Sequence, residues 1–227
     1  MKPALLLLAV ALVAQSAAHA TTSAATAKTA KAEMRAPAPA HTPRLDPEFA
    51  ALLAQAVFPS AVAAYDRGDY QQALADFRQL AAQGVAGAEY NLGVMYVKGQ
   101  GVTQSYAQAL KWWHLAAAQG YVAAEFNLGA MYDEGQGVTQ SYVNALKWYR
   151  LAAAQGYAAA EFFLGVMHKN GQGVPQNFVT AYKWELIAKA TMSATNRHYA
   201  TVSNNVEQLA AMMTPAQIAQ AQQEASA

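Results

Sequence analysis

The 227-residue sequence contains no cysteine, so disulfide bonds and cysteine-ligated metal sites are excluded and packing alone must stabilise the fold. Charged residues are scarce at 13% of the chain, and 15 Lys and Arg nearly balance 14 Asp and Glu. The formal net charge of +1 predicts no strongly basic surface. We therefore expect no nucleic-acid partner and no attachment to an anionic membrane surface.

The motifs of common enzyme classes are absent as well. The sequence has no HExxH, G-x-S-x-G, P-loop or Rossmann glycine pattern, and its Gly-Gln-Gly triplets lack the Lys-Ser/Thr of a phosphate loop. Four histidines follow the first twenty residues without metal-ligand spacing, namely His41, His114, His168 and His198. We therefore expect no metal and no cofactor.

Long apolar runs are confined to the first twenty residues, MKPALLLLAVALVAQSAAHA. Lys2 precedes a short apolar run, and Ala18-His19-Ala20 has the small residues of a cleavage site. This pattern predicts a signal peptide over residues 1–20, secretion into the periplasm, and no transmembrane anchor after cleavage. An uncleaved N-terminal anchor is the alternative. Residues 21–46 are rich in Ala, Thr and Pro and predict a disordered linker.

The most informative feature is a segment that recurs with a period of 36 residues. Residues 85–120 match residues 121–156 at 25 of 36 positions, and residues 157–192 match 121–156 at 19 positions. A period of 20–50 residues is typical of solenoids, in which each repeat buries its apolar face against the next one.

Each period predicts a helix, a tight loop, a second helix and a turn. AEYNLGVMY has helical spacing, Gly99 ends that helix, and Ser105 with Gln108 forms a capping-box pattern before the second helix. The equivalent cap residues of the later copies are Ser141 and Asn177. A glycine inside each first helix predicts a close approach of two helices, at Gly93, Gly129 and Gly165.

The segments on either side of the repeats also have helical patterns. Residues 47–84 predict two antiparallel helices around a Gly-Asp turn, and residues 193–227 predict a helical C-terminal cap that includes Thr214-Pro215. The sequence therefore predicts an all-α, right-handed α/α solenoid with seven or eight helices before the cap.

The stretch AEYNLGVMYVKGQGVTQSYAQALKWWHLAAAQG resembles the Sel1-like repeat, a relative of the tetratricopeptide repeat. The resemblance is carried by Leu92-Gly93, Met95-Tyr96, Gly99, Gly101-Val102, Gln104, Ala109-Leu110, Trp112 and residues 116–120. It is weaker over residues 157–192, and residues 47–84 are more similar to a tetratricopeptide unit. The family resemblance implies a scaffold for protein–protein interaction, and exported members are often associated with the cell envelope. A cysteine-rich branch is linked to β-lactams, but this cysteine-free sequence gives no basis for that activity.

Tetratricopeptide geometry implies that one face of each first helix lines a concave groove. The predicted partner-binding residues are Tyr90, Val94, Val97, Lys98, Phe126, Ala130, Asp133, Glu134, Phe162, Val166, Lys169 and Asn170. Aromatic and aliphatic residues at the first two positions disfavour a carboxylate clamp and favour an amphipathic helix or extended peptide of a protein partner. The alternative is that the three aromatic residues pack inward as core.

Other recurring residues predict structure rather than binding. The series Lys111, Lys147, Lys183 and the series Glu89, Glu125, Glu161 are interpreted as solvated or helix-capping charges. The series Trp112, Trp148, Trp184 is interpreted as core. Trp113, whose counterparts are Tyr149 and Glu185, is expected to be partly exposed.

The predicted function is a non-enzymatic protein-interaction scaffold in the cell envelope. The alternative is an envelope hydrolase, β-lactamase-like or cell-wall-directed, or a cell-wall ligand-binding protein, and a structural spacer is a third reading. The only pairing that could support hydrolysis is His168 with Asp133 or Glu134 from the adjacent repeat.

Overall fold

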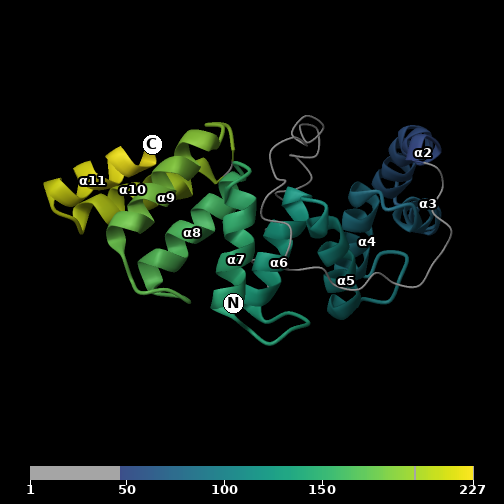
Figure 1. Cartoon of the computed structure of the whole chain (residues 1–227), viewed down its shortest axis with the longest axis horizontal. Helices are drawn as coiled ribbons and strands as arrows, with labels where there is room; N and C mark the ends of the chain where they lie inside the picture. The colour runs from purple at the N-terminus through teal and green to yellow at the C-terminus, as the bar shows by residue number, and fades with distance from the viewer. Residues whose placement is uncertain (1–46, 197, 227) are drawn as a thin grey trace. The chain divides into compact units, whose positions relative to one another are not determined.

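The computed structural model describes residues 47–196 and 198–226, and all regular secondary structure in this part is α-helical (Figure 1). The helices are α2 (Pro47–Asp66), α3 (Tyr70–Ala82), α4 (Ala86–Lys98), α5 (Tyr106–Ala118), α6 (Val122–Glu134), α7 (Tyr142–Ala153), α8 (Ala158–Asn170), α9 (Phe178–Thr191), α10 (Tyr199–Ala211) and α11 (Pro215–Ala225). The all-α prediction is confirmed. The predicted signal peptide and linker lie outside the described residues, and no described helix is long and apolar enough to cross a membrane.

The chain divides into two compact units, residues 1–127 and residues 128–227, with the boundary inside α6. In the first unit α2 packs on α3, α3 on α4, and α4 on α5. In the second unit α7 packs on α8 and α8 on α9, and α9 contacts both α10 and α11. Consecutive antiparallel helices therefore form the layers of each unit, as expected for an α/α solenoid.

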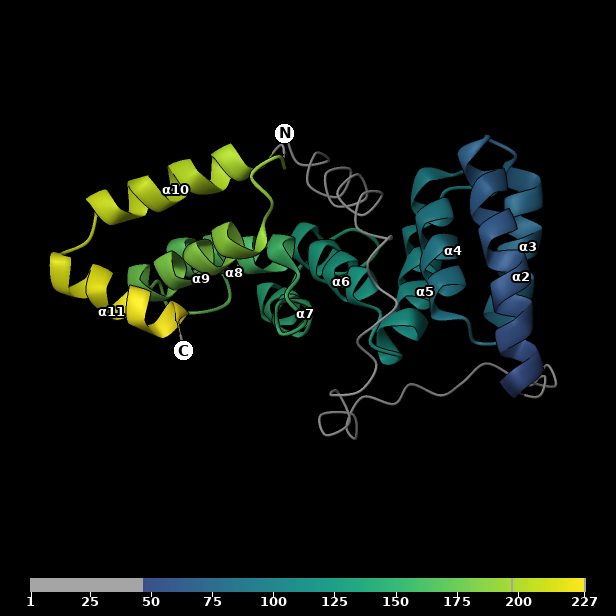
Figure 2. The same cartoon turned by 90° about the horizontal axis from the view of Figure 1, so that it is seen from above.

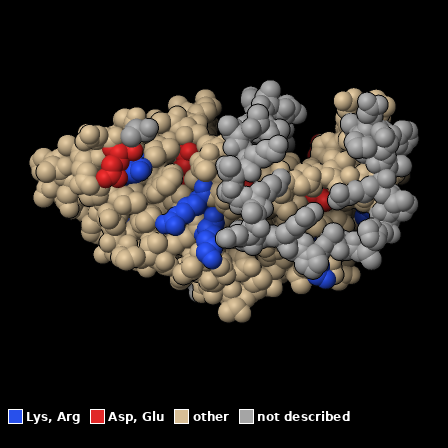
Figure 3. Space-filling view, in the orientation of Figure 1, with Lys and Arg blue, Asp and Glu red and all other residues tan. Residues whose placement is uncertain are grey.

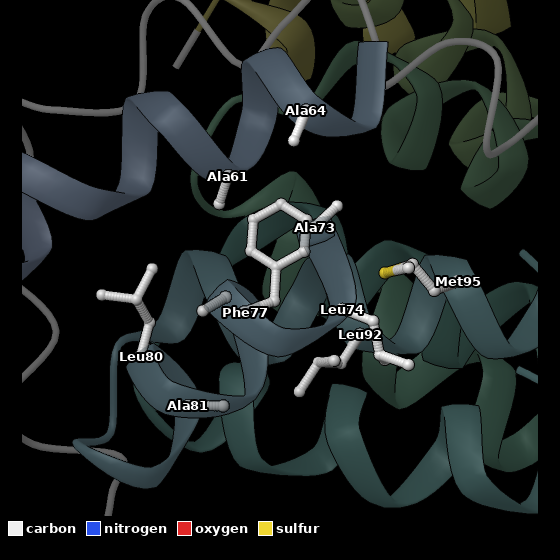
Figure 4. Close-up of a cluster of buried hydrophobic side chains, with 10 residues drawn as sticks. Ala61, Ala64, Ala73, Leu74, Phe77, Leu80, Ala81, Leu92 and Met95 are labelled. Carbon is white, nitrogen blue, oxygen red and sulfur yellow. The ribbon is translucent and has the colours of Figure 1, made fainter. Parts of the chain in front are cut away.

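The core of the first unit is formed by small residues of α2 and large residues of the next two helices. Ala61 and Ala64 face Phe77, which is fully buried (Figure 4). Leu92 and Met95 of α4 complete the same cluster. Because alanine adds little side-chain bulk, α2 can approach the Phe77 ring closely, and burial of such a ring contributes about 2 kcal/mol.

The second unit has two buried clusters that meet on α9. Tyr182 packs with Leu209 of α10 and Ala221 of α11, while Met192 packs with Val202 of α10. Figure 2 shows α9 lying between α10 and α11. The last two helices therefore cover the apolar surface of α9.

The loop after each first helix is fastened by a repeated set of hydrogen bonds. In the first full repeat, Gln104 Nε2 donates to the Val97 carbonyl at 2.7 Å, and the Ser105 amide donates to the Tyr96 carbonyl at 2.9 Å. Gln140 and Gln176 make the same bonds to the carbonyls of Asp133 and Lys169. These contacts satisfy carbonyls that the end of the helix leaves without intrahelical donors.

The helix N-caps form as predicted, with one correction. The side chains of Ser105, Ser141 and Asn177 each accept a hydrogen bond from the backbone amide three residues later. The capping box predicted at Ser105 and Gln108 is incomplete, because the Ser105 amide bonds the Tyr96 carbonyl instead of the Gln108 side chain. Thr214 and Gln217 form a complete box at the start of α11.

The second glycine of the Gly-Gln-Gly loop joins the first and third repeats to the preceding second helix. A Cβ atom on Gly101 would lie 2.8 Å from the Tyr70 carbonyl oxygen, and one on Gly173 would lie 2.7 Å from the Tyr142 carbonyl carbon. Both glycines also have positive φ. Only glycine permits this backbone-to-backbone approach.

Candidate interaction surface

The mid-helix glycine of each repeat packs against one residue of the following helix. In the first unit, a Cβ atom on Gly93 would overlap the indole of Trp113, whose Nε1 donates to the Tyr90 carbonyl at 3.0 Å. Trp113 is fully buried, whereas its neighbour Trp112 is half-buried. The prediction that Trp113 is partly exposed is therefore wrong, because α5 turns it, rather than Trp112, toward Gly93.

In the second repeat, Tyr149 takes the place of Trp113. Its ring is fully buried, stacks on Phe163 with centroids 5.3 Å apart, and lies against Gly129. The Tyr149 hydroxyl interacts with Asp133. Burial, together with the negative charges of Asp133 and Glu134, holds the Tyr149 pKa well above its usual value. Burial raises the pKa of Asp133, while the bond from Tyr149 lowers it.

In the third repeat, the same position is Glu185. Its side chain is fully buried, and a Cβ atom on Gly165 would lie 2.8 Å from its Cγ. Burial raises the Glu185 pKa to about 7, against the opposing effects of an Asn205 hydrogen bond and the Lys169 cation. Lys169 and Asp133 occupy equivalent positions four residues after their glycines. The side chains at these two positions are therefore an acid and a phenol in the second repeat, and a cation and an acid, without an ion pair, in the third.

The recurring glutamates of the first helices are buried, contrary to the prediction of solvated charges. Glu89, Glu125 and Glu161 expose 4% or less of their surface. In the first unit, Gln119 Nε2 donates to Glu89 Oε2 at 2.7 Å, across the two helices of one repeat. In the second unit, burial raises the Glu161 pKa, and a hydrogen bond from Thr191 opposes that effect. Glu89 and Glu161 therefore each connect the two helices of their own repeat. The lysines agree better with the prediction, since Lys111 and Lys147 are exposed and Lys183 is half-buried.

Five predicted groove residues are buried and present almost no surface to a partner. They are Tyr90, Val94, Val97, Phe126 and Ala130. The Tyr90 ring lies 5.0 Å from the Tyr121 ring and 6.4 Å from the Trp113 ring, measured between centroids. The core alternative therefore holds for Tyr90 and Phe126, since both are buried, and for Tyr90 the neighbouring aromatic rings enclose the side chain.

The other predicted groove residues keep accessible surface. Lys98 and Asn170 are exposed, while Asp133, Glu134, Phe162, Val166 and Lys169 are half-buried. The accessible set is thus concentrated at the helix ends and on α8.

In the first unit, Lys98 belongs to a polar cluster that the sequence did not predict. Its Nζ lies 3.1 Å from the Tyr65 hydroxyl, which donates to Gln100 Oε1. Gln100 Nε2 in turn donates to the Tyr70 hydroxyl at 2.7 Å. Burial, with Tyr70 and Asp66, raises the Tyr65 pKa to about 12, so Tyr65 remains a neutral donor. The cluster links three helices and leaves Lys98 in contact with solvent.

The predicted pairing of His168 with a carboxylate is not formed. Asp133 interacts with Tyr149 instead, and Gln136 Nε2 donates to Glu134 Oε2 at 2.6 Å. Burial lowers the His168 pKa, and the Arg150 cation lowers it further. Among the described residues, no group of three or more His, Asp or Glu side chains is placed to hold a metal ion.

Basic side chains are grouped on one face of the second unit. Figure 3 shows Lys and Arg side chains gathered over α7 and α8. These helices carry the exposed Lys147 and Arg150 and the half-buried Lys169. Among the described residues, these three basic side chains take part in no ion pair, and an acidic group could approach them.

Comparison with known proteins places the repeats in a family. Residues 86–121, 122–157 and 158–184 each match the Sel1 repeat. The chain is similar to the crystal structure of a Sel1 repeat protein from Oxalobacter formigenes, with 31% identity over 66% of this chain and a TM-score of 0.59. It is also similar to a protective antigen of uropathogenic Escherichia coli strains with an SLR fold, with 35% identity over 66% of this chain and a TM-score of 0.55.

The chain spans 57% of the Oxalobacter structure and 34% of the Escherichia coli structure. No curated protein sequence matches the chain. The matched residues begin one position after the repeat boundaries predicted above, and the third match ends at residue 184, before the buried Glu185.

Proposed function

Because three segments of this chain match the Sel1 repeat, we propose that the chain is a non-enzymatic scaffold of the cell envelope that binds a partner protein through α8. Sel1-repeat proteins are generally scaffolds for protein–protein interaction. Binding requires accessible side chains in a fixed arrangement, and a packed helix supplies that arrangement without a conformational change.

The observation that carries the proposal is the difference between α8 and the earlier first helices. Val166 and Lys169 retain accessible surface on α8, and Phe162 is half-buried at the edge of the cluster that contains Met192 and Val202. Their counterparts at the first two positions are buried in both earlier repeats, as Tyr90, Val94, Phe126 and Ala130. The third repeat therefore leaves part of this helix face accessible, whereas the preceding repeats bury it at these positions.

The arrangement of this α8 stripe indicates the kind of partner. Phe162, Val166, Lys169 and Asn170 are spaced four, three and one residues apart, so they follow one face of the helix over about 12 Å. The stripe is apolar at its start and cationic at its end. An amphipathic helix or extended peptide with apolar residues followed by an acidic residue complements it.

The envelope location rests on the first twenty residues, whose short charged start, apolar run and Ala-x-Ala site are typical of a signal peptide. Expression of the full chain followed by mass spectrometry of the exported fraction tests this part. We expect a mature protein that begins at Thr21. A chain that retains residues 1–20 and stays in the cytoplasm would contradict it.

Site-specific photo-crosslinking in intact cells tests the binding surface. We expect a crosslinkable amino acid at Val166 or Asn170 to capture one defined protein partner, identified by mass spectrometry. The matched control is Val143, a valine of α7 whose side chain is 54% exposed. Equal capture from Val143 would refute a specific surface on α8.

A substitution supplies the second half of the test. Val166→Glu places a carboxylate against the apolar residues of the bound partner, where the charge loses contact with water. We expect the affinity for the partner to fall at least tenfold. Val143→Glu is the control for the added charge. Circular dichroism must show that both variants keep their helical content. Unchanged affinity of Val166→Glu for the captured protein would exclude the α8 stripe as the binding surface.

A further inference from the structure

Glu185 of α9 is a buried carboxyl group at a position that the preceding repeats fill with aromatic rings. Its side chain is fully buried, and Trp113 and Tyr149 are its counterparts. The close contact with Gly165 described above leaves no space on the α8 side. A buried carboxylate is costly unless it is paired or protonated. The groups around Glu185 therefore decide its charge.

Among the described residues, the Glu185 carboxyl accepts one direct hydrogen bond, and its donor lies in the last part of the chain. Asn205 Nδ2 of α10 donates to Oε1 at 3.1 Å, while Oε2 has no partner within the described residues. From α8, the Lys169 cation lowers the Glu185 pKa without forming an ion pair. On the other two helices packed against α9, Glu224 of α11 pairs with Lys183 at 3.9 Å, and Glu207 of α10 is exposed.

Helix α10, which carries Asn205, also covers apolar side chains. Val202 of α10 is buried against Met192, and Phe162 of the α8 stripe packs at the edge of this cluster. Figure 2 shows α10 running beside α9. Docking of α10 therefore buries the apolar cluster and the Glu185 carboxyl in one step.

We propose that α10 is a pH-sensitive cover of the third repeat, which docks firmly when Glu185 is protonated and loosens when Glu185 ionises. The geometry points to this role because the carboxyl lies at the α9–α10 contact, has one neutral donor, and lacks a bonded cation. The inference concerns the docking of α10 and does not depend on the proposed partner.

The direction of the pH effect follows from linkage. With α10 detached, Glu185 meets water and titrates near its ordinary pKa of 4.5, whereas in the docked state the pKa is about 7. The docked state therefore binds a proton more tightly. Docking is strongest below about pH 4.5, weakens as the pH rises toward about 7, and stays weak above it. The two pKa values correspond to a change on the order of a hundredfold in the docking equilibrium.

Hydrogen exchange measured by mass spectrometry on the full chain tests the proposal. Protection factors of the α10 amides are compared at pH 5 and pH 8.5 after correction for the intrinsic exchange rate at each pH. We expect α10 protection to fall by a factor of roughly ten to a hundred in the wild-type chain. The amides of α3 in the first unit provide the internal reference.

Three variants separate the proposal from general pH effects. Glu185→Gln keeps the size of the side chain and removes its titration, so its α10 protection should not change with pH. Glu207→Gln, on the solvent side of α10, should behave like the wild type. Asn205→Ala removes a bond that lowers the Glu185 pKa, so the loss of protection should move to higher pH.

Two results would overturn the proposal. One is a fall in α10 protection that is as large in Glu185→Gln as in the wild type. The other is an equal fall across α8, α9 and α10, because the unit would then open as a whole and α10 would not act as a separate cover.

Discussion

Substitution of Gly129 by alanine should destabilise the second unit, although alanine is the better helix former. In a helix interior the change normally stabilises by about 1 kcal/mol. Here the new Cβ atom would lie 2.6 Å from both Cδ1 and Cε1 of Tyr149. Carbon atoms in contact are normally about 3.5–4.0 Å apart, so the ring or the helix must move by about 1 Å.

The surroundings of Tyr149 decide how much this movement costs. The other side of the ring stacks on Phe163, and the hydroxyl interacts with Asp133, so the ring cannot move without disturbing both contacts. Overpacking of a well-packed core costs about 1–3 kcal/mol, and loss of a hydrogen bond to a charged group costs about 1.5–3 kcal/mol. After the helix-forming gain of about 1 kcal/mol is subtracted, we expect a net loss of about 1.5–5 kcal/mol.

Urea unfolding followed by circular dichroism measures this effect. With a denaturant dependence of about 1–3 kcal/mol per molar urea, the midpoint should fall by about 1–2 M. The control is the same substitution in a Tyr149→Leu background, where the ring is gone and Gly129→Ala should raise the midpoint. An unchanged or higher midpoint in the otherwise wild-type chain would refute the argument that Tyr149 requires a glycine at position 129.

Two further substitutions test contacts of the second unit. Ser141→Ala removes the side-chain cap of α7 and should cost about 1 kcal/mol in urea unfolding, whereas Thr139→Ala, in the exposed loop, should change stability by less than about 0.5 kcal/mol. Tyr149→Phe removes a bond that lowers the Asp133 pKa, so carboxyl ¹³C NMR should show a higher Asp133 pKa. Tyr142→Phe should leave that pKa unchanged, and a shift there of equal size would mean that Tyr149 is not the responsible donor.

The sequence predicts the helices well because the signals for their ends are local. Ser141 and Asn177 accept the predicted amides, and Gly99 has the left-handed conformation expected at the end of α4. Each of these depends on residues only a few positions apart. An exact 36-residue repeat then makes the same interpretation apply to every copy.

The burial of individual side chains was harder to predict because it depends on partners in other helices. Trp112 and Trp113 are adjacent aromatic residues, and periodicity does not determine which of them faces Gly93. Glu89 in the first turn has the pattern of an exposed cap charge, yet its partner is Gln119, 30 residues away. The groove prediction failed at Tyr90 for the same reason, since rings from α5 and the following turn cover it.

The division between contacts within repeats and contacts between them has a consequence for how such a chain can change in length. Gly129 and Tyr149, like Glu89 and Gln119, lie within one 36-residue period, so duplication or deletion of a whole period carries both partners together. The junction made by Gly101 uses the backbone and the Cβ atom of Tyr70 in the preceding helix, which do not depend on the rest of that side chain. The bond between Glu185 and Asn205 is different, because it ties the third repeat to the terminal helices. New copies can therefore enter before that repeat, while the third repeat and the helices after it must be inherited as a block.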